Sequence, residues 1–425
     1  MATNEVTLSR PLKVSIIGAG LGGLTAAIAL RKSGHNVQVF EASDKQTEIG
    51  AGITLQVNAL RVLHQLGFHT ANLQGVEFDT MVRLDARTGS GTLNSGGARS
   101  TTEDNGRARP IACHRSDFRN ELERLATAEE GQGTPAQLHL GSKVLSCDPE
   151  VGSITLANGN TISADLVIGA DGIHSTIRST ILGQAVQPLP CGISCFRFLL
   201  DASGVKDIPD LRWYTDDPHL HKGIVWTGFK SFRMIVIYPV RNRTLINFVG
   251  SFADEDQGKP DWAPSATRQE VLEKFHDAHS KFLRLLDLPI VTPILKWKLR
   301  TVPVLGNWIR GHAALLGDSA HGSVPFMGQG ASMAIEDAGV LGVLLSLGTT
   351  KDEIPARLAA YETLRKERAE FVSKKSLDRA LSNDVYYEPP SPETLARVMQ
   401  HDAIQVAQQY VSAHFSGETG ARKNI

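Results

Sequence analysis

The sequence predicts an α/β (α+β) fold in which a parallel-sheet domain is interleaved with an antiparallel-sheet domain and followed by a helical tail. Residues 13–41 have the pattern of a strand, a helix and a strand, a βαβ unit whose crossover implies a parallel sheet. Residues 192–252 have the pattern of strands with little helix. From residue 355 onward the pattern is helical and polar. Segments typical of the first domain return near residues 313–347, so we expect the two domains to interleave.

Composition indicates a globular protein whose partner is a small molecule. Of the 425 residues, 41% are hydrophobic and 21% are charged, which is enough to bury a large core. The 44 lysines and arginines nearly balance the 45 aspartates and glutamates, and the formal net charge is -1. Such a balance creates no field that would attract nucleic acid or an anionic membrane. We therefore expect no nucleic-acid partner.

The cysteines and the hydropathy pattern favour a reducing, cytoplasmic setting. Four cysteines are too few for a disulfide scaffold in a chain of this length, and no cluster with histidine suggests a metal site. No segment reaches the roughly 18 to 20 apolar residues that a membrane helix needs. We therefore expect free thiols, no bound metal and no transmembrane segment.

The later elements follow from the period of the apolar residues, which is 3.6 in helices and 2 in strands. A stretch rich in glycine, serine and threonine over residues 88–106 predicts a surface loop. The other predicted elements are, in chain order, a helix over 115–130, strands within 143–170 around an Asn158-Gly159 turn, strands over 193–200, 223–229, 232–240 and 244–252, an amphipathic helix over 267–286, a buried strand over 313–316 and an apolar helix over 330–347.

A glycine-rich turn follows the first strand. Gly18-Ala-Gly20-Leu-Gly22-Gly23 has the G-x-G-x-x-G form and opens a helix, as a Rossmann-like dinucleotide-binding motif requires. Gly18 allows the tight turn, Gly20 lets the backbone approach a pyrophosphate, and Gly23 allows close packing of strand and helix. The amino end of the helix offers unpaired N–H groups to the phosphates. Glu41 ends the second strand, where a carboxylate can bind ribose hydroxyls.

Two further segments distinguish between the dinucleotides that such a motif can bind. Residues 165–178, with the sequence Asp-Leu-Val-Ile-Gly-Ala-Asp-Gly-Ile-His-Ser-Thr-Ile-Arg, resemble the DG segment of the class A, single-component FAD-dependent monooxygenases. Residues 314–338, which contain Gly-Asp-Ser-Ala-His and then Pro-Phe-Met-Gly-Gln-Gly-Ala, resemble the GD segment of that family. The three motifs occur in the family's order. Within that family, the sequence of these segments most resembles the salicylate-hydroxylase-like branch, which includes fungal aromatic hydroxylases.

This resemblance implies FAD as the cofactor and a Rossmann-like FAD-binding domain interleaved with an antiparallel-sheet substrate domain. The expected FAD-binding domain comprises residues 12–80, 111–190 and 301–350, of which the last part carries the GD segment. We expect residues 81–110 to form a loop-rich excursion and residues 191–300 to form the substrate-binding sheet. Residues 351–425 would then be a C-terminal helical region.

The resemblance also implies which residues contact the cofactor. Asp318 follows a buried strand, so its carboxylate can accept hydrogen bonds from ribityl hydroxyls. Gly328 and Gly330 precede a helix whose amino end can stabilise negative charge at the N1–C2=O locus of the flavin. Pro325 is expected near the flavin face. The remaining expected contacts are Gly52, Arg115, Ala331 and, in a supporting role, Asp171.

The family reaction would hydroxylate an aromatic substrate, phenolic or polycyclic, with O2 and with NADPH or NADH. In that reaction the reduced flavin forms a C4a-hydroperoxide, which transfers an oxygen atom. Arg197 matches the strand arginine of the branch and, because its guanidinium stays charged when partly buried, can hold a phenolate or polarise a carbonyl. Tyr238 matches the Tyr-Pro strand end of the branch, and its hydroxyl can orient a substrate oxygen. An ordinary ion pair for Arg197 and packing under FAD for Tyr238 are the alternative interpretations.

Other reactions on the same framework remain open at this point. An epoxidase, or an oxygenase of indoles or alkaloids, would use Arg197 to polarise an intermediate, whereas a flavin-dependent reductase would not need oxygen. The choice between NADPH and NADH and the oligomeric state are open as well. Aromatic residues of the inner sheet predict an apolar pocket; these residues are Phe196, Phe198, Trp213, Trp226, Phe229 and Phe248.

Overall fold

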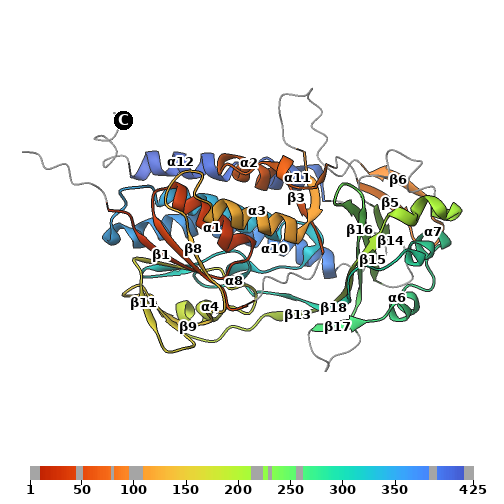
Figure 1. Cartoon of the computed structure of the whole chain (residues 1–425), viewed down its shortest axis with the longest axis horizontal. Coiled ribbons are helices and arrows are strands. Elements are labelled where there is room, and N and C mark those ends of the chain that lie inside the picture. The colour runs from red at the N-terminus through yellow and green to blue at the C-terminus, as the bar shows by residue number, and fades with distance from the viewer. Residues whose placement is uncertain are drawn as a thin grey trace, which may run out of the picture.

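The computed structural model describes residues 10–44, 51–77, 81–94, 109–211, 224–227, 232–254, 262–381 and 390–415. These residues build two lobes, each around its own large sheet (Figure 1). The long strand β13 (Leu189–Asp201) leads from the first lobe into the second (Figure 1). The predicted combination of a parallel-sheet domain and an antiparallel-sheet domain is therefore confirmed.

The first lobe is built on a six-stranded sheet in the order β19-β20-β12-β1-β2-β8. The central strand β1 (Lys13–Ile17) pairs in parallel with β2 (Asn36–Phe40) and with β12 (Leu166–Gly169). Every residue of β1 after Lys13 is buried, as expected of a strand that is covered on both faces. The other strands are β8 (Gln137–His139), β20 (Ala313–Leu315) and β19 (Ile309–Arg310).

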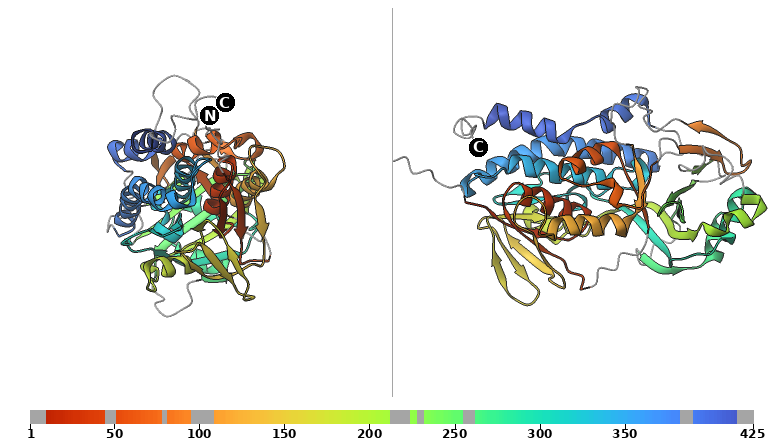
Figure 2. Two further views of the ribbon diagram at one scale, coloured as in Figure 1. Left: turned by 90° about the vertical axis from the view of Figure 1, so that its left-hand side faces the viewer. Right: turned by 45° about the horizontal axis from the view of Figure 1, so that its top comes forward.

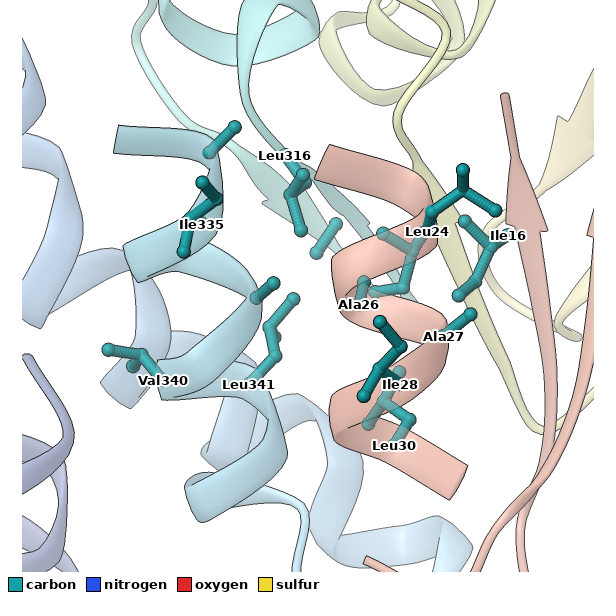
Figure 3. Packing of buried hydrophobic residues seen from close by; sticks show 14 of the residues in the cluster. Ile16, Leu24, Ala26, Ala27, Ile28, Leu30, Leu316, Ile335, Val340 and Leu341 are labelled. Atoms are coloured by element: carbon teal, nitrogen blue, oxygen red, sulfur yellow. The ribbon is translucent and has the colours of Figure 1, made fainter. Parts of the chain in front are cut away.

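Two apolar helices pack against each other beside this sheet. Figure 3 shows Leu341 on the side of α9 (Gly330–Leu344) that faces α1 (Leu21–Lys32), and Leu24 of α1 beside Ile16 of β1. Gly342 of α9 lies so close to α1 that a Cβ there would be 2.9 Å from the Cβ of Ala29. The contact therefore needs small side chains on both helices. The other helices of this lobe are α2 (Val57–Gln65), α3 (Arg115–Thr127), α4 (Thr176–Leu182) and α8 (Asp318–His321).

Two small sheets complete the first lobe. In one, β7 (Ile111–His114) lies between β3 (Gly52–Leu55) and β4 (Val76–Glu77). The other is a meander of β9 (Val144–Asp148), β10 (Ser153–Leu156) and β11 (Thr161–Ser163). Gly159 adopts a φ of 86° at the turn between β10 and β11, so the predicted Asn158-Gly159 hairpin is confirmed.

The second lobe is an eight-stranded sheet in the order β17-β18-β13-β16-β15-β14-β5-β6. One face is closed by a phenylalanine core in which the Phe198 ring stacks on Phe248, with centroids 4.4 Å apart. The predicted aromatic pocket is wrong for Phe196, Phe198 and Phe248, because side chains alternate along a strand and these point into that core. Trp213 and Phe229 lie outside the described residues. The strands not yet given are β14 (Ile224–Thr227), β15 (Arg233–Val240), β16 (Leu245–Ala253), β17 (Trp262–Ala266) and β18 (Ile294–Thr301).

Two expectations about local structure differ from what is observed. The segment expected to be loop-rich contains a hairpin of β5 (Met81–Asp85) and β6 (Gly91–Asn94), and β5 pairs in parallel with β14 at the edge of the large sheet. The helix expected over 267–286 is broken into α6 (Arg268–Lys274) and α7 (Ser280–Leu283). The break lets the His279 amide donate to the carbonyl of Ala86 beside the hairpin.

The C-terminal region is helical, as predicted, and packs on the first lobe. Its helices are α10 (Ile354–Leu381), α11 (Pro392–Met399) and α12 (Ala403–His414), which Figure 2 draws in blue along one side of that lobe. A Cβ at Gly339 of α9 would lie 2.8 Å from Ile404 of α12 and 2.7 Å from Val62 of α2. In the part of the chain that the structure describes, no helix is long and apolar enough to cross a membrane.

Candidate active site

The glycine turn between β1 and α1 forms an open cradle. Gly18 has a φ of 102°, and a Cβ there would lie 2.4 Å from the carbonyl oxygen of Ala170. A Cβ at Gly23 would lie 2.0 Å from the oxygen of Gly18, whereas nothing lies within 4 Å of one at Gly20. The first turn of α1 has neither a side-chain cap nor an acidic residue. Its amide groups are therefore available to an anionic ligand.

Glu41, directly after β2, lies beside this cradle. One carboxylate oxygen accepts a hydrogen bond from the Ala19 amide at 2.8 Å, and the other accepts from the Ser43 amide at 2.9 Å. The side chain remains partly exposed. Glu41 thus supports the glycine turn itself, and it keeps acceptor capacity for the hydroxyls of a ribose.

Asp171 serves mainly to shape the loop before α4. Its carboxylate accepts from the Ser175 hydroxyl at 2.5 Å and from the amides of Thr176 and Ile177 at 2.7 and 3.1 Å. The buried Arg178 donates to the carbonyl of Ser319 at 3.0 Å and so joins this loop to α8. These contacts are those of a residue that shapes a turn, and a supporting role of Asp171 toward the cofactor stays a prediction.

The GD segment contributes an exposed carboxylate and a second open helix end. Asp318 is exposed at the first position of α8, and Pro325 is exposed in the short 3-10 turn Pro325–Met327. Gly328 has a φ of 60°, and nothing lies within 4 Å of a Cβ built at Gly330, the first residue of α9. Ala331 follows and is partly exposed. Here too the backbone leaves room for a ligand at a helix amino end.

Contacts between backbone segments bring these parts together. A Cβ at Gly22 would lie 2.6 Å from Leu316, so the glycine turn and the GD segment are in contact. A Cβ at Gly328 would lie 3.7 Å from Gln56, which follows β3. The Arg115 amide donates to the carbonyl of Ala51 at 2.8 Å, which places the start of α3 beside β3. These contacts join segments that carry predicted cofactor residues, and the binding of a cofactor by those residues stays a prediction.

A buried ionic network lies beneath the GD segment. Asp337 accepts from the Gly317 amide at 3.0 Å and pairs with His321 at 2.7 Å and with Arg365 at 2.8 Å. Burial alone would raise the pKa of Asp337, but His321 and Arg365 outweigh it and lower that pKa to about 2. His321 thus has a structural role, through its bond to Asp337.

The two predicted catalytic residues meet Gly52 at the junction of the lobes. The Arg197 guanidinium donates through Nη2 to the Gly52 carbonyl at 3.3 Å, while its buried Nε has no hydrogen-bond partner among the described residues. A Cβ at Gly52 would lie 2.6 Å from the Tyr238 ring. Burial raises the pKa of Tyr238 to about 12, although Arg197 and a hydrogen bond with Thr54 oppose the rise.

Asn247, which no motif indicated, belongs to the same cluster. Its Oδ1 accepts from the Gly52 amide at 2.6 Å, and its buried Nδ2 has no partner among the described residues. The side chain is fully buried on β16, directly opposite Tyr238 in the register. The sequence did contain a signal for this residue, because Asn247 is the polar residue in the apolar run Leu-Ile-Asn-Phe-Val. A polar side chain buried in such a strand needs a hydrogen-bond partner.

The arrangement suits FAD. Two helix amino ends without caps can hold its phosphates and its pyrimidine ring, and Glu41 and Asp318 leave carboxylate acceptors for its sugar and ribityl hydroxyls. The glycines at 20 and 330 face open space that a side chain would fill. Among the described residues, no group of histidine, cysteine, aspartate or glutamate has the arrangement of a metal site.

The comparisons with known proteins agree. The FAD binding domain family matches residues 11–376. The chain is 42% identical over 387 residues to hispidin-3-hydroxylase of Neonothopanus nambi, which covers 89% of this chain and 90% of the relative. It is 30% identical over 396 residues to salicylate hydroxylase of Pseudomonas putida, which covers 88% of this chain and 86% of the relative.

Solved structures share the fold. The crystal structure of CtdE with FAD and a substrate has a TM-score of 0.80 at 22% identity, covering 95% of this chain and 100% of the other. A salicylate hydroxylase–substrate complex has a TM-score of 0.69 at 26% identity, covering 97% of both chains. The chain therefore belongs to the class A FAD-dependent monooxygenases, a family of flavoprotein oxidoreductases.

Proposed function

We propose that this enzyme hydroxylates an aromatic substrate, phenolic or polycyclic, that binds at the junction of the lobes, beside the contact of β3 with β13, β15 and β16. The observation that carries the proposal is the guanidinium of Arg197, which reaches the junction of the lobes and keeps its Nε without a partner among the described residues. Two similar proteins, hispidin-3-hydroxylase and salicylate hydroxylase, are named for reactions on aromatic compounds. The cytoplasmic location expected from the sequence remains a prediction.

The overall reaction balances with one reductant and one O2. NAD(P)H, O2, a proton and the aromatic C–H compound give NAD(P)⁺, water and the corresponding C–OH compound. Bound FAD supplies the redox chemistry that couples NAD(P)H to O2. The glycine turn, Glu41 and the amino end of α9 would hold that cofactor, and Asp318 would accept from its ribityl hydroxyls.

The residues at the junction prepare the substrate. An aromatic ring becomes more reactive as its phenolic oxygen loses a proton, and Arg197 stabilises the resulting anion because a guanidinium stays charged in a partly buried site. With a pKa of about 12, Tyr238 stays protonated at neutral pH and can donate a hydrogen bond to the same oxygen. Asn247 holds Gly52 in place beside both of them.

The test is product analysis with ¹⁸O2 and a panel of phenols, together with the rate of NAD(P)H oxidation. We expect a phenol to stimulate NAD(P)H oxidation and to yield a ring product carrying ¹⁸O. Arg197→Met should lower kcat/KM by roughly 100-fold, because one positioned charge contributes about 2.7 kcal/mol or more in such sites. Arg197→Lys should recover part of the activity, and Arg310→Met, on the exposed edge strand β19, should leave it unchanged.

Other outcomes would identify the competing reactions. An epoxide or an oxidised indole in place of a phenolic product would favour the other oxygenases of the family. Flavin reduction without incorporation of ¹⁸O into any product would favour a reductase and contradict the proposal. Full activity of Arg197→Met with ring hydroxylation intact would remove Arg197 from the mechanism.

A further inference from the structure

The loop of residues 328–330, which we call the GQG loop, is held by a side chain that lies outside the glycine, DG and GD segments. Asn58, the second residue of α2, is 1% exposed. Its Nδ2 donates to Oε1 of Gln329 at 3.0 Å and to Oε1 of Glu336 at 2.7 Å. An amide nitrogen carries two hydrogens, so one side chain can make both bonds. Because a carboxylate at this position only accepts, the atom facing Glu336 must be the nitrogen.

Gln329 points the opposite way from its two glycine neighbours. Its side chain is 1% exposed, whereas Gly328 is exposed and Gly330 faces open space. Gln329 is also the residue that immediately precedes α9. The side chain of Gln329 thus anchors the GQG loop to the interior, and its bond to Asn58 lies beside the first amides of α9.

Glu336 connects the same asparagine to the C-terminal helices. Arg368 of α10 binds both oxygens of this buried carboxylate, through Nε at 2.7 Å and Nη2 at 2.8 Å. The Arg368 guanidinium also donates to the carbonyls of Val398 at 2.8 Å and Arg397 at 3.1 Å, near the end of α11. An unbroken chain of hydrogen bonds therefore runs from the GQG loop through Asn58 to α11.

We propose that Asn58 is a positioning residue for FAD, which aligns the GQG loop with α11 and thereby controls how firmly the enzyme retains the flavin. The inference rests on the cofactor role proposed for Gly328 and Gly330, and it is independent of the substrate. Without Asn58 the buried amide oxygen of Gln329 would lose its hydrogen-bond donor, and the Glu336 carboxylate would lose one of its donors. A buried acceptor without a partner is unfavourable, so the loop would move to satisfy it.

Asn58→Leu tests this role because leucine has the same number and branching of side-chain heavy atoms and cannot donate a hydrogen bond. The measurement is the rate of FAD release from diluted holoenzyme, followed by the rise in flavin fluorescence. We expect release to be roughly tenfold faster, the factor that corresponds to one lost buried hydrogen bond. The visible absorption bands of the bound flavin should shift as well, because the dipoles at the amino end of α9 change direction.

Val62→Ala is the matched control. Val62 is buried on the same helix and contacts α9 at Gly339, two turns beyond the GQG loop. It should lower the melting temperature without changing the flavin spectrum. If Asn58→Leu and Val62→Ala accelerate FAD release equally for an equal loss of melting temperature, Asn58 acts only through the packing of α2 and the proposal is overturned.

Gln329→Ala provides a second, independent test. If Asn58 acts through Gln329, the double variant should release FAD no more than about twofold faster than the faster single variant. Effects that multiply in the double variant would contradict the proposal. Gln329→Ala alone should also accelerate release, which keeps the test decisive if Asn58→Leu fails to fold.

Gly330→Val separates this inference from the assignment of the site. A valine there would occupy the space in which no atom lies within 4 Å, so FAD binding should be lost if the GQG loop holds the flavin. Normal FAD retention in Gly330→Val would overturn both the loop assignment and the inference. Weak retention in Gly330→Val with normal retention in Asn58→Leu would overturn the inference alone.

Discussion

At Gly52, two side chains from the second lobe hold a single residue of the first lobe. Asn247 accepts from its amide at 2.6 Å, and Arg197 donates to its carbonyl at 3.3 Å. A side chain at position 52 would collide with both Tyr238 and Asn247. The geometry of the proposed substrate site is therefore tied to the strand that carries Gly52.

Asn247→Leu should reduce stability as well as activity. The change leaves the Gly52 amide without its acceptor, and we expect a loss of about 1–3 kcal/mol in the free energy of unfolding. Urea unfolding of the holoenzyme measures this loss. Asn72→Leu, which removes an exposed asparagine bonded to Glu121, is the control and should cost less. An equal cost for both would show that the buried position of Asn247 has no special importance.

Tyr238→Phe should lower kcat/KM and leave the shape of its pH profile unchanged between pH 8 and about pH 11. With its pKa raised to about 12, Tyr238 does not ionise in that range, so an alkaline limb there must come from another group. The raised pKa also makes the free energy of unfolding depend on pH. Tyr238 favours the folded state below pH 10, and this contribution is lost as pH rises toward 12, because the unfolded chain releases the proton first. If kcat/KM of the wild-type enzyme changes near pH 10 and this change disappears in Tyr238→Phe, the prediction is contradicted.

At the residue scale, motif and resemblance predicted residues whose backbone or charge suits a cofactor, because those needs constrain the local sequence; their contact with FAD stays a prediction. Glycines at tight turns and carboxylates after strands are of this kind. Asn247 and Asn58 were not predicted, since each acts through partners that are about 195 and 271 positions away. Only the folded chain shows which amide such a side chain meets.

The contact between α9 and α10 depends on buried charge. Arg365 is fully buried and lies 2.7 Å from Glu336 and 2.8 Å from Asp337. Arg365→Met would leave Asp337 with His321 but without its guanidinium, and we expect a loss of about 3–5 kcal/mol, typical of breaking a buried ion pair. Lys374→Met on the exposed side of α10 should cost less than about 1 kcal/mol. Thermal unfolding of both variants is the measurement, and similar costs would refute the role of the network.

The junction between α11 and α12 should weaken in mild acid. Burial, together with Arg368, lowers the pKa of His401 from 6.5 to about 4, although Glu336 opposes the shift. Between these two values the unfolded chain binds a proton at His401 and the folded chain does not, so stability is lost as pH falls from 6.5 toward 4. His401→Gln should flatten the melting temperature over that window. An unchanged slope in the variant would mean that other groups produce it.

At the element scale, local pattern predicted the opening βαβ unit, the Asn158-Gly159 hairpin and the apolar helix α9. The helix expected over 267–286 is instead two short helices, with Phe275 directly after the first and Phe282 within the second, and both rings enter the core of the second lobe. The hairpin of β5 and β6 was taken for a loop because its pairing partner, β14, lies far along the chain. Local periodicity carries no information about such partners.

At the scale of the whole molecule, the cofactor and the junction of the lobes should be linked in stability. The proposed FAD contacts lie in the first lobe, but Gly52 is bonded to β13 and β16 of the second. FAD at about 100 times its dissociation constant should add about 2.7 kcal/mol to the free energy of unfolding. Calorimetry should show both lobes melting at a higher temperature. A second-lobe transition that FAD leaves unmoved would show that the lobes unfold independently.

The strand orders of the two sheets also constrain how the protein is made. β1 emerges early from the ribosome, yet its neighbour β12 begins at Leu166 and the next strand, β20, begins at Ala313. The partner of β5 in the large sheet, β14, is likewise synthesised much later, because it begins at Ile224. At roughly 5–20 residues per second, synthesis of the chain takes about 20–85 seconds, and for part of that time each of these strands lacks one of its two neighbours. A polypeptide that stops before residue 313 would lack β20 beside β12, and we expect such a chain to aggregate or to be degraded.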